Sequence, residues 1–180
     1  MTDPYSVKGS SILSKLEYLQ DVHGEEARQS VEAPLRERGL IPFLASSWYP
    51  YAVYIEVNKA IAGEVFNGDL SRLTEVGEYS AQKSLLGTYR MLAQANDYFG
   101  LLSQLAILHR RFYNEGTLTI DVPEDKSSCQ ILLSGAPEYA EADVHIAAGF
   151  YIKAAELTDR PGAKVAVDRR PDSIAFTVSW

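Results

Sequence analysis

The chain has 180 residues and a formal net charge of −7, with 46% hydrophobic and 23% charged residues. This length predicts one domain with an ordinary core, and the composition excludes intrinsic disorder. A net-acidic chain is a poor binder of nucleic acid, because affinity for phosphates depends on Lys and Arg. A single cysteine, Cys129, permits no disulfide within the chain and indicates either a reducing compartment or a protein that is indifferent to redox conditions. No signal-peptide pattern follows Met1 and no apolar run has membrane length, so we expect a cytoplasmic protein without membrane insertion.

Apolar residues recur at helical spacing through about residue 113. The first helix is predicted over residues 10–23. A more polar helix is predicted over 25–38, where Pro34 indicates a kink or two short pieces. A third helix is predicted to begin at Trp48-Tyr49-Pro50 and to end near Phe66, because proline is tolerated in a first helical turn.

Two more helices complete this first part of the chain. The segment 70–94 contains Gly77 and Gly87, which are typical of places where another backbone approaches closely. The next helix is capped by Asn96 or Asp97. One stripe of that helix is apolar and consists of Leu101, Leu105, Leu108 and Phe112.

After about residue 115 the pattern changes to the alternation of strands. The order is strand, strand, long helix, strand, strand, and the two leading strands form an antiparallel pair. Their predicted ranges are 117–122, 129–134, 138–158, 164–168 and 174–180.

A run of helices ahead of such a unit predicts an α+β fold with an antiparallel sheet, not a doubly wound one. We expect a single domain over residues 1–180. Its helical part covers about 1–113, and its strand-strand-helix-strand-strand part covers about 114–180.

Four aromatic residues lie within seven positions: Trp48, Tyr49, Tyr51 and Tyr54. Tyrosine and tryptophan combine apolar area with a polar tip, which suits the rim of a ligand pocket or an interface. The same cluster also suits the anchoring of a helix in the core. Both interpretations stay open.

The sequence predicts neither a catalytic nor a metal site. The three histidines, His23, His109 and His145, lie in separate segments without a second ligand at metal spacing. The acidic residues between Glu115 and His145 fall on a turn, a strand and a helix start, which is typical of a solvated face. Nucleophile and phosphate-loop motifs are absent. His109 lies beside the apolar stripe of its helix, as a boundary residue or a ligand contact.

The order of these elements, with Leu105-Ala106-Ile107-Leu108-His109, resembles the haem NO-binding (H-NOX) domains. It is also similar to the 4-vinyl-reductase domains and to subunits of the TRAPP vesicle-tethering complex. The chain further resembles a family of uncharacterised myxobacterial proteins of about this length. The matching motifs are Val7-Lys8-Gly9-Ser10, Trp48-Tyr49-Pro50, Leu86-Gly87-Thr88-Tyr89-Arg90, Tyr113-x-x-Gly116 and Phe176-x-Val178-x-Trp180.

The resemblance places His109 at the position of the proximal haem ligand of H-NOX domains. That family anchors the haem propionates with Tyr-x-Ser-x-Arg, whereas the corresponding stretch here is Leu132-Leu133-Ser134-Gly135-Ala136. Only the serine is kept. The resemblance therefore implies the fold without the haem anchors, and we expect no cofactor. A haem-based gas sensor with His109 as proximal ligand is the alternative.

We therefore predict a non-enzymatic sensory or adaptor module that works through an apolar pocket or through protein contacts. The expected partners are a second copy of the chain in a homodimer, another signalling protein, or a small apolar ligand. An enzyme acting on a small hydrophobic molecule rests on fold analogy alone. The candidate ligand-binding residues are Trp48, Tyr49, Tyr51, Tyr54 and His109.

Overall fold

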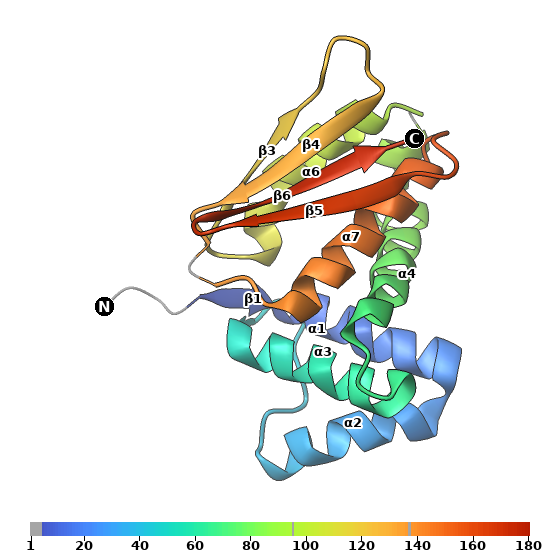
Figure 1. Ribbon diagram of the computed structural model, residues 1–180. Helices are drawn as coiled ribbons and strands as arrows, with labels where there is room; N and C mark the ends of the chain where they lie inside the picture. Colours follow the sequence, from blue (N-terminus) through green and yellow to red (C-terminus); the bar gives the residue numbers. More distant parts are fainter. Residues whose placement is uncertain (1–4, 95, 137) are drawn as a thin grey trace.

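The computed structural model describes residues 5–94, 96–136 and 138–180. It has the predicted α+β architecture, with N-terminal helices below and a four-stranded sheet above (Figure 1). None of the described helices is long and apolar enough to cross a bilayer. The N-terminal part consists of β1 (Ser6–Lys8), α1 (Gly9–Tyr18), the π-helical turn η1 (Leu19–His23), α2 (Glu25–Glu37), β2 (Trp48–Pro50) and α3 (Tyr51–Phe66).

The second part contains a sheet that is antiparallel throughout, with the strand order β3-β4-β6-β5. Alternate residues of β4 are buried, which directs Cys129, Ile131 and Leu133 to one face of the sheet. Helices α6 and α7 lie on one side of the sheet (Figure 1). The elements are η2 (Leu70–Arg72), α4 (Leu73–Leu86), α5 (Arg90–Gln94), α6 (Tyr98–Phe112), β3 (Thr117–Asp121), β4 (Ser128–Ser134), α7 (Glu141–Glu156), β5 (Lys164–Arg170) and β6 (Ser173–Ser179).

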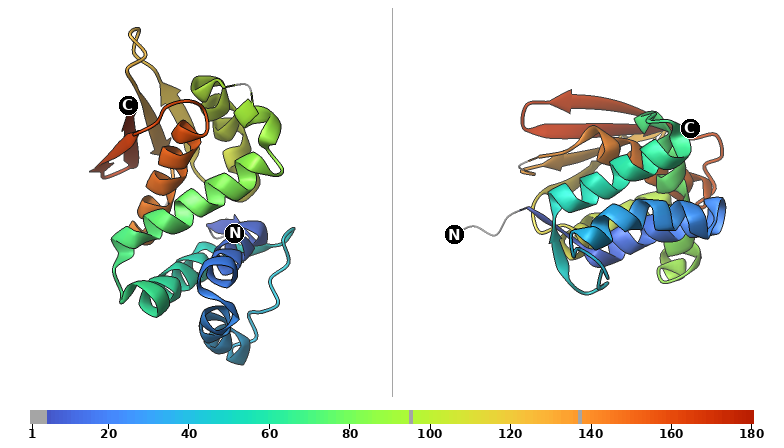
Figure 2. Two further views of the ribbon diagram at one scale, coloured as in Figure 1. Left: turned by 90° about the vertical axis from the view of Figure 1, so that its right-hand side faces the viewer. Right: turned by 90° about the horizontal axis from the view of Figure 1, so that it is seen from below.

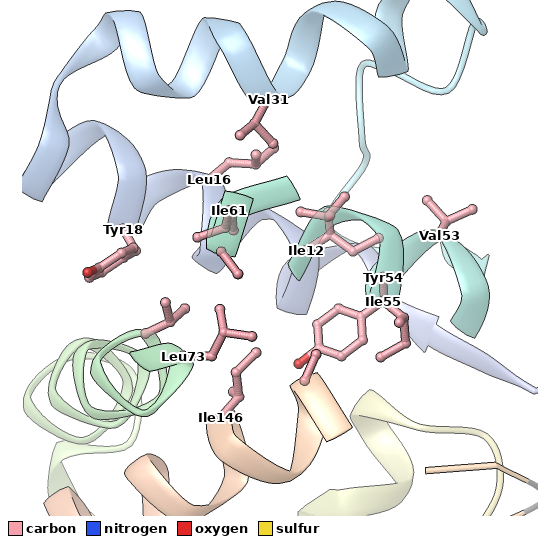
Figure 3. Close-up of a cluster of buried hydrophobic side chains, with 14 of the residues drawn as sticks. Ile12, Leu16, Tyr18, Val31, Val53, Tyr54, Ile55, Ile61, Leu73 and Ile146 are labelled. Carbon is pink, nitrogen blue, oxygen red and sulfur yellow. The ribbon is translucent and has the colours of Figure 1, made fainter. Parts of the chain in front are cut away.

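Two buried clusters form the core, one in each part of the chain. In the N-terminal cluster, Ile12 and Leu16 of α1 face Ile61 of α3 (Figure 3). Ile146 of α7 reaches into the same cluster, while other α7 residues pack in the second one. Complete burial of each such side chain stabilises the fold by about 1.5–3 kcal/mol. Helix α7 therefore joins the two halves of the core.

Helices α4 and α7 cross at very short range (Figure 2). A Cβ atom at Gly77 would lie 2.0 Å from the Ile146 carbonyl oxygen. A Cβ atom at Gly149 would lie 2.0 Å from the Thr74 carbonyl oxygen. The close approach predicted at Gly77 is therefore confirmed, because any side chain at either glycine would push the two backbones apart.

The predicted start of the third helix at Trp48 is wrong. Residues 48–50 form β2, which pairs antiparallel with β1, and Pro50 has an extended backbone. The Tyr51 amide donates to the carbonyl oxygen of Tyr5 at 2.8 Å, so the helix begins only at Tyr51. Local pattern could not show this pairing, because the two three-residue strands are about 40 residues apart.

Two other boundaries also differ from the prediction. Helix α2 is one continuous helix through Pro34, so the alternative of two short pieces is wrong. The segment predicted as a single helix over 70–94 divides into η2, α4 and α5, and α4 ends at Leu86 with Gly87 as its C-cap. Gly87 is thus a helix terminus, where a glycine costs less than in a helix interior.

Candidate functional site

A cavity of about 440 Å³ lies between the N-terminal helix α1 and the elements of the second part. This volume is within the range of small-molecule binding sites. One wall comes from α1 and α4 and carries polar side chains: Ser10, Ser11, Ser14, Lys15, Ser80 and Ser84. A second wall comes from α6, α7 and the sheet and is mostly apolar: Leu105, Leu108, Phe112, Leu118, Leu133 and Phe150.

A buried carboxylate lies at the end of the cavity where α7 begins. Asp143 is 1% exposed and accepts hydrogen bonds from three phenols. The donors are Tyr51 at 3.0 Å, Tyr54 at 3.1 Å and Tyr113 at 3.3 Å. Burial raises the pKa of Asp143 to about 6, although the phenols and the nearby Lys15 oppose this shift. At pH 7 the carboxylate is therefore mostly ionised and held by hydroxyl groups.

A buried cation lies on the polar wall. The Lys15 ammonium donates to Ser80 Oγ at 2.8 Å, and the Ser80 hydroxyl in turn donates to the Val76 carbonyl oxygen at 2.8 Å. Burial lowers the pKa of Lys15 to about 8, against the opposing effect of Asp143. Among the ion pairs of the described residues, none joins Lys15 to Asp143. The cavity thus holds one positive and one negative charge that are near each other but not in contact.

His109 lines the cavity near the end of α6. Its ring stacks on Tyr113, with centroids 4.9 Å apart and an interplanar angle of 15°. Its Nε2 lies 3.4 Å from the Glu115 carbonyl oxygen. A Cβ atom at Gly116 would be 3.3 Å from the same nitrogen. Burial lowers the pKa of His109, which favours the neutral imidazole. The Nε2 edge therefore faces the backbone of residues 115–116.

The structure divides the five candidate residues into two groups. Tyr54 and His109 line the cavity, and Tyr51 joins them through its bond to Asp143. Tyr49 lies elsewhere, where its hydroxyl accepts from the Leu44 amide at 2.8 Å. Trp48 is 43% exposed, with the Lys8 ammonium 4.2 Å above its ring. The aromatic cluster is separated because β2 ends before Tyr51, and Tyr51 and Tyr54 lie one turn apart on α3.

Two central residues of the cavity were not among the candidates. Asp143 belongs to the acidic stretch assigned to a solvated face, and that assignment is wrong for this residue because it is buried. Lys15 lies three residues after Ile12 and one before Leu16, on the buried face of α1. A lysine within an apolar helical stripe is a sequence signal that could have identified it. The described residues contain no group of three or more His, Cys, Asp or Glu that could hold a metal ion.

The fold and the cavity define an α+β domain with a ligand-sized space between its helical part and its sheet. No protein-family model and no curated protein sequence matches the chain. Solved structures of H-NOX proteins do match the chain over nearly its whole length. The chain therefore has the H-NOX fold.

Three of these structures illustrate the likeness. An H-NOX protein from S. oneidensis in the Fe(II)NO state superimposes with a TM-score of 0.72 at 11% identity, covering 96% of this chain and 98% of that one. The Fe(II) unliganded H-NOX protein from K. algicida superimposes with a TM-score of 0.67 at 13% identity, covering 96% of this chain and 95% of that one. An oxygen-binding H-NOX domain related to soluble guanylate cyclases gives 0.68 at 10% identity, with coverages of 95% and 92%.

Proposed function

We propose that this protein is a non-enzymatic sensory module that binds a small apolar ligand in the cavity without haem. The cavity itself carries the proposal, because it is of ligand size and has a large apolar wall with a few convergent polar groups. Its α1 wall belongs to the N-terminal part, and its α6 and α7 walls belong to the second part. A ligand that contacts both parts can favour one arrangement of them over another, which is the basis of a sensor.

The polar groups of the cavity support binding better than catalysis. A general base must be free to accept a proton from a substrate. The Asp143 carboxylate instead accepts from three phenols, and His109 is stacked on Tyr113 with its Nε2 near the Glu115 backbone. These groups are held in place by the protein's own hydrogen bonds. The resemblance to 4-vinyl-reductase domains and TRAPP subunits, which suggests signalling or adaptor partners, stays a prediction.

The residues of the cavity do not fit haem. Haem brings two propionate carboxylates, and Asp143 already places a third carboxylate in this space. Among the described residues that line the cavity, Lys15 is the one lysine or arginine. Three buried carboxylates beside a single ammonium leave charges unpaired, and each unpaired buried charge costs several kcal/mol. His109 would also have to leave its stacked position to present Nε2 to iron.

We therefore expect no sharp Soret band at one haem per chain after reconstitution with haem, only weak absorption from non-specifically bound haem. The measurement is a visible spectrum of wild type, His109→Ala and His145→Ala. His145 is the matched control, because it does not line the cavity. A sharp Soret band at one haem per chain that is lost in His109→Ala and kept in His145→Ala would favour the gas sensor instead.

The proposed ligand site is tested with a neutral apolar fluorophore, N-phenyl-1-naphthylamine. We expect saturable binding of one probe per chain to the wild type. Ala147→Trp should abolish it, because Ala147 lines the cavity and an indole would fill the space. Ala52→Trp is the matched control, since Ala52 is exposed on α3. Binding that survives Ala147→Trp in a variant with an unchanged melting temperature would refute the site.

We also propose that the module is a homodimer. Gly149 of α7 packs on α4 within the same chain, and Ile12 of α1 is fully buried in the core. Exposed apolar side chains of the second part supply candidate contacts instead: Leu86, Met91 and Ile107. Light scattering should then give twice the 19.9 kDa mass of one chain.

A further inference from the structure

The Lys15 ammonium has hydrogen-bonding capacity that the protein leaves unused. A lysine carries three N–H donors. Within the described part of the chain, one hydrogen bond from Nζ is found, to Ser80 Oγ. The side chain is 5% exposed, so bulk water reaches it poorly, and it lines the cavity. Because buried polar groups are normally paired, the remaining donors point to an acceptor that a ligand would bring.

The charge already present in the cavity limits what that acceptor can be. The Asp143 carboxyl group, held by three phenol hydroxyls, and the Lys15 ammonium, held by Ser80 Oγ, already place one acidic and one basic group in the cavity. An anionic ligand would leave a net negative charge in a buried space, and a cationic ligand would add a second positive charge beside Lys15. Either costs free energy that a neutral ligand does not.

We infer that the cavity selects an uncharged, mostly apolar molecule with an acceptor oxygen, such as a ketone, that binds to Lys15. This inference rests on the proposed function and names its ligand class. The oxygen would lie on the α1 and α4 wall near Lys15 and Ser80, where hydroxyl groups of Ser11 and Ser14 also line the cavity. The apolar body would lie against Leu105 and Phe150 on the second wall.

Three naphthalenes of similar shape test this selection by calorimetry at pH 7. They are 2-acetylnaphthalene with a carbonyl oxygen, 2-naphthoate with a negative charge, and 2-ethylnaphthalene with neither. We expect the acetyl compound to bind at least about tenfold more tightly than 2-ethylnaphthalene, as expected for one hydrogen bond to a charged group. We expect it also to bind more tightly than 2-naphthoate, whose negative charge would lie in a buried space that already holds the Asp143 carboxyl group.

The variant Lys15→Met removes the ammonium with little change in volume, and Lys59→Met, on the exposed surface of α3, is its control. Lys15→Met should bind the acetyl and ethyl compounds equally, whereas Lys59→Met should keep the wild-type preference. An unchanged preference in Lys15→Met, or tightest binding of naphthoate, would overturn the inference while leaving the cavity a ligand site. Failure of all three compounds and of N-phenyl-1-naphthylamine to bind would overturn the proposed function as well.

Discussion

Gly149→Ala is expected to lower the free energy of unfolding by about 3 kcal/mol, at the upper end of the usual cost of overpacking. The added methyl group would lie 2.0 Å from the Thr74 carbonyl oxygen, which is backbone and cannot rotate away. Helices α4 and α7 would have to separate. Because α7 contributes to both buried clusters, their separation would loosen both halves of the core. Urea unfolding followed by circular dichroism measures the change.

Gly63→Ala is the matched control for this prediction. Gly63 lies in α3, is exposed, and has no atom within 4 Å of its added Cβ. Alanine should there stabilise the protein by about 0.5–1 kcal/mol, since glycine is the poorer helix former. Equal effects of the two substitutions would show that the α4–α7 crossing is wider than described.

Asp143→Asn is expected to change how stability depends on pH. The carboxylate has an ordinary pKa of 3.8 and a pKa of about 6 in the folded protein. The folded state therefore binds the proton more tightly than the unfolded state. The resulting contribution of Asp143 to the free energy of unfolding is fully present below pH 3.8 and is lost as the pH rises through 6. The loss amounts to about 2.4 kcal/mol between pH 4 and pH 7. Asparagine keeps an acceptor oxygen but does not titrate. As the pH rises from 4 to 7, the free energy of unfolding of the variant should therefore increase by this amount relative to wild type.

The measurement is urea unfolding of wild type and variant at several values between pH 4 and pH 7. The contributions of all other carboxylates cancel in the difference between the two free energies of unfolding, because both proteins contain them. Asp125→Asn is the control, and its stability relative to wild type should change with pH in the opposite direction. The reason is that hydrogen bonds from the Ser127 amide and hydroxyl groups lower the pKa of Asp125. A difference between wild type and Asp143→Asn that does not vary with pH would contradict the buried, ionised carboxylate.

The fold was predictable from the sequence because its elements have clear local patterns. Alternation over 117–122 and 129–134 indicated the first strand pair, and the α+β class followed from the order of elements. The short strands β1 and β2 were not predictable in the same way. Their pairing is a contact between distant segments, and the proline and the two aromatic residues of 48–50 suit a helix start equally well.

The site was predictable only in part. Tyr51, Tyr54 and His109 were candidates by residue type, and the structure brings them to one end of the cavity. Asp143 was not identified, because the helix dipole stabilises acidic side chains in a first helical turn. An aspartate at that position therefore gives no sign of a buried site. Its true partners are phenols from α3 and from the residue after α6, and that convergence exists only in three dimensions.

The proposed function requires that a cavity without haem, between the two parts of the chain, holds a small neutral molecule. Native mass spectrometry of the protein, expressed with added haem precursor, distinguishes such a ligand from haem. We expect an adduct of a small organic molecule on wild type and on Ala52→Trp, released on denaturation, and no such adduct on Ala147→Trp. An adduct with the mass of haem would refute the haem-free cavity, and a protein without any adduct that also fails to bind the neutral fluorophore would refute the ligand site.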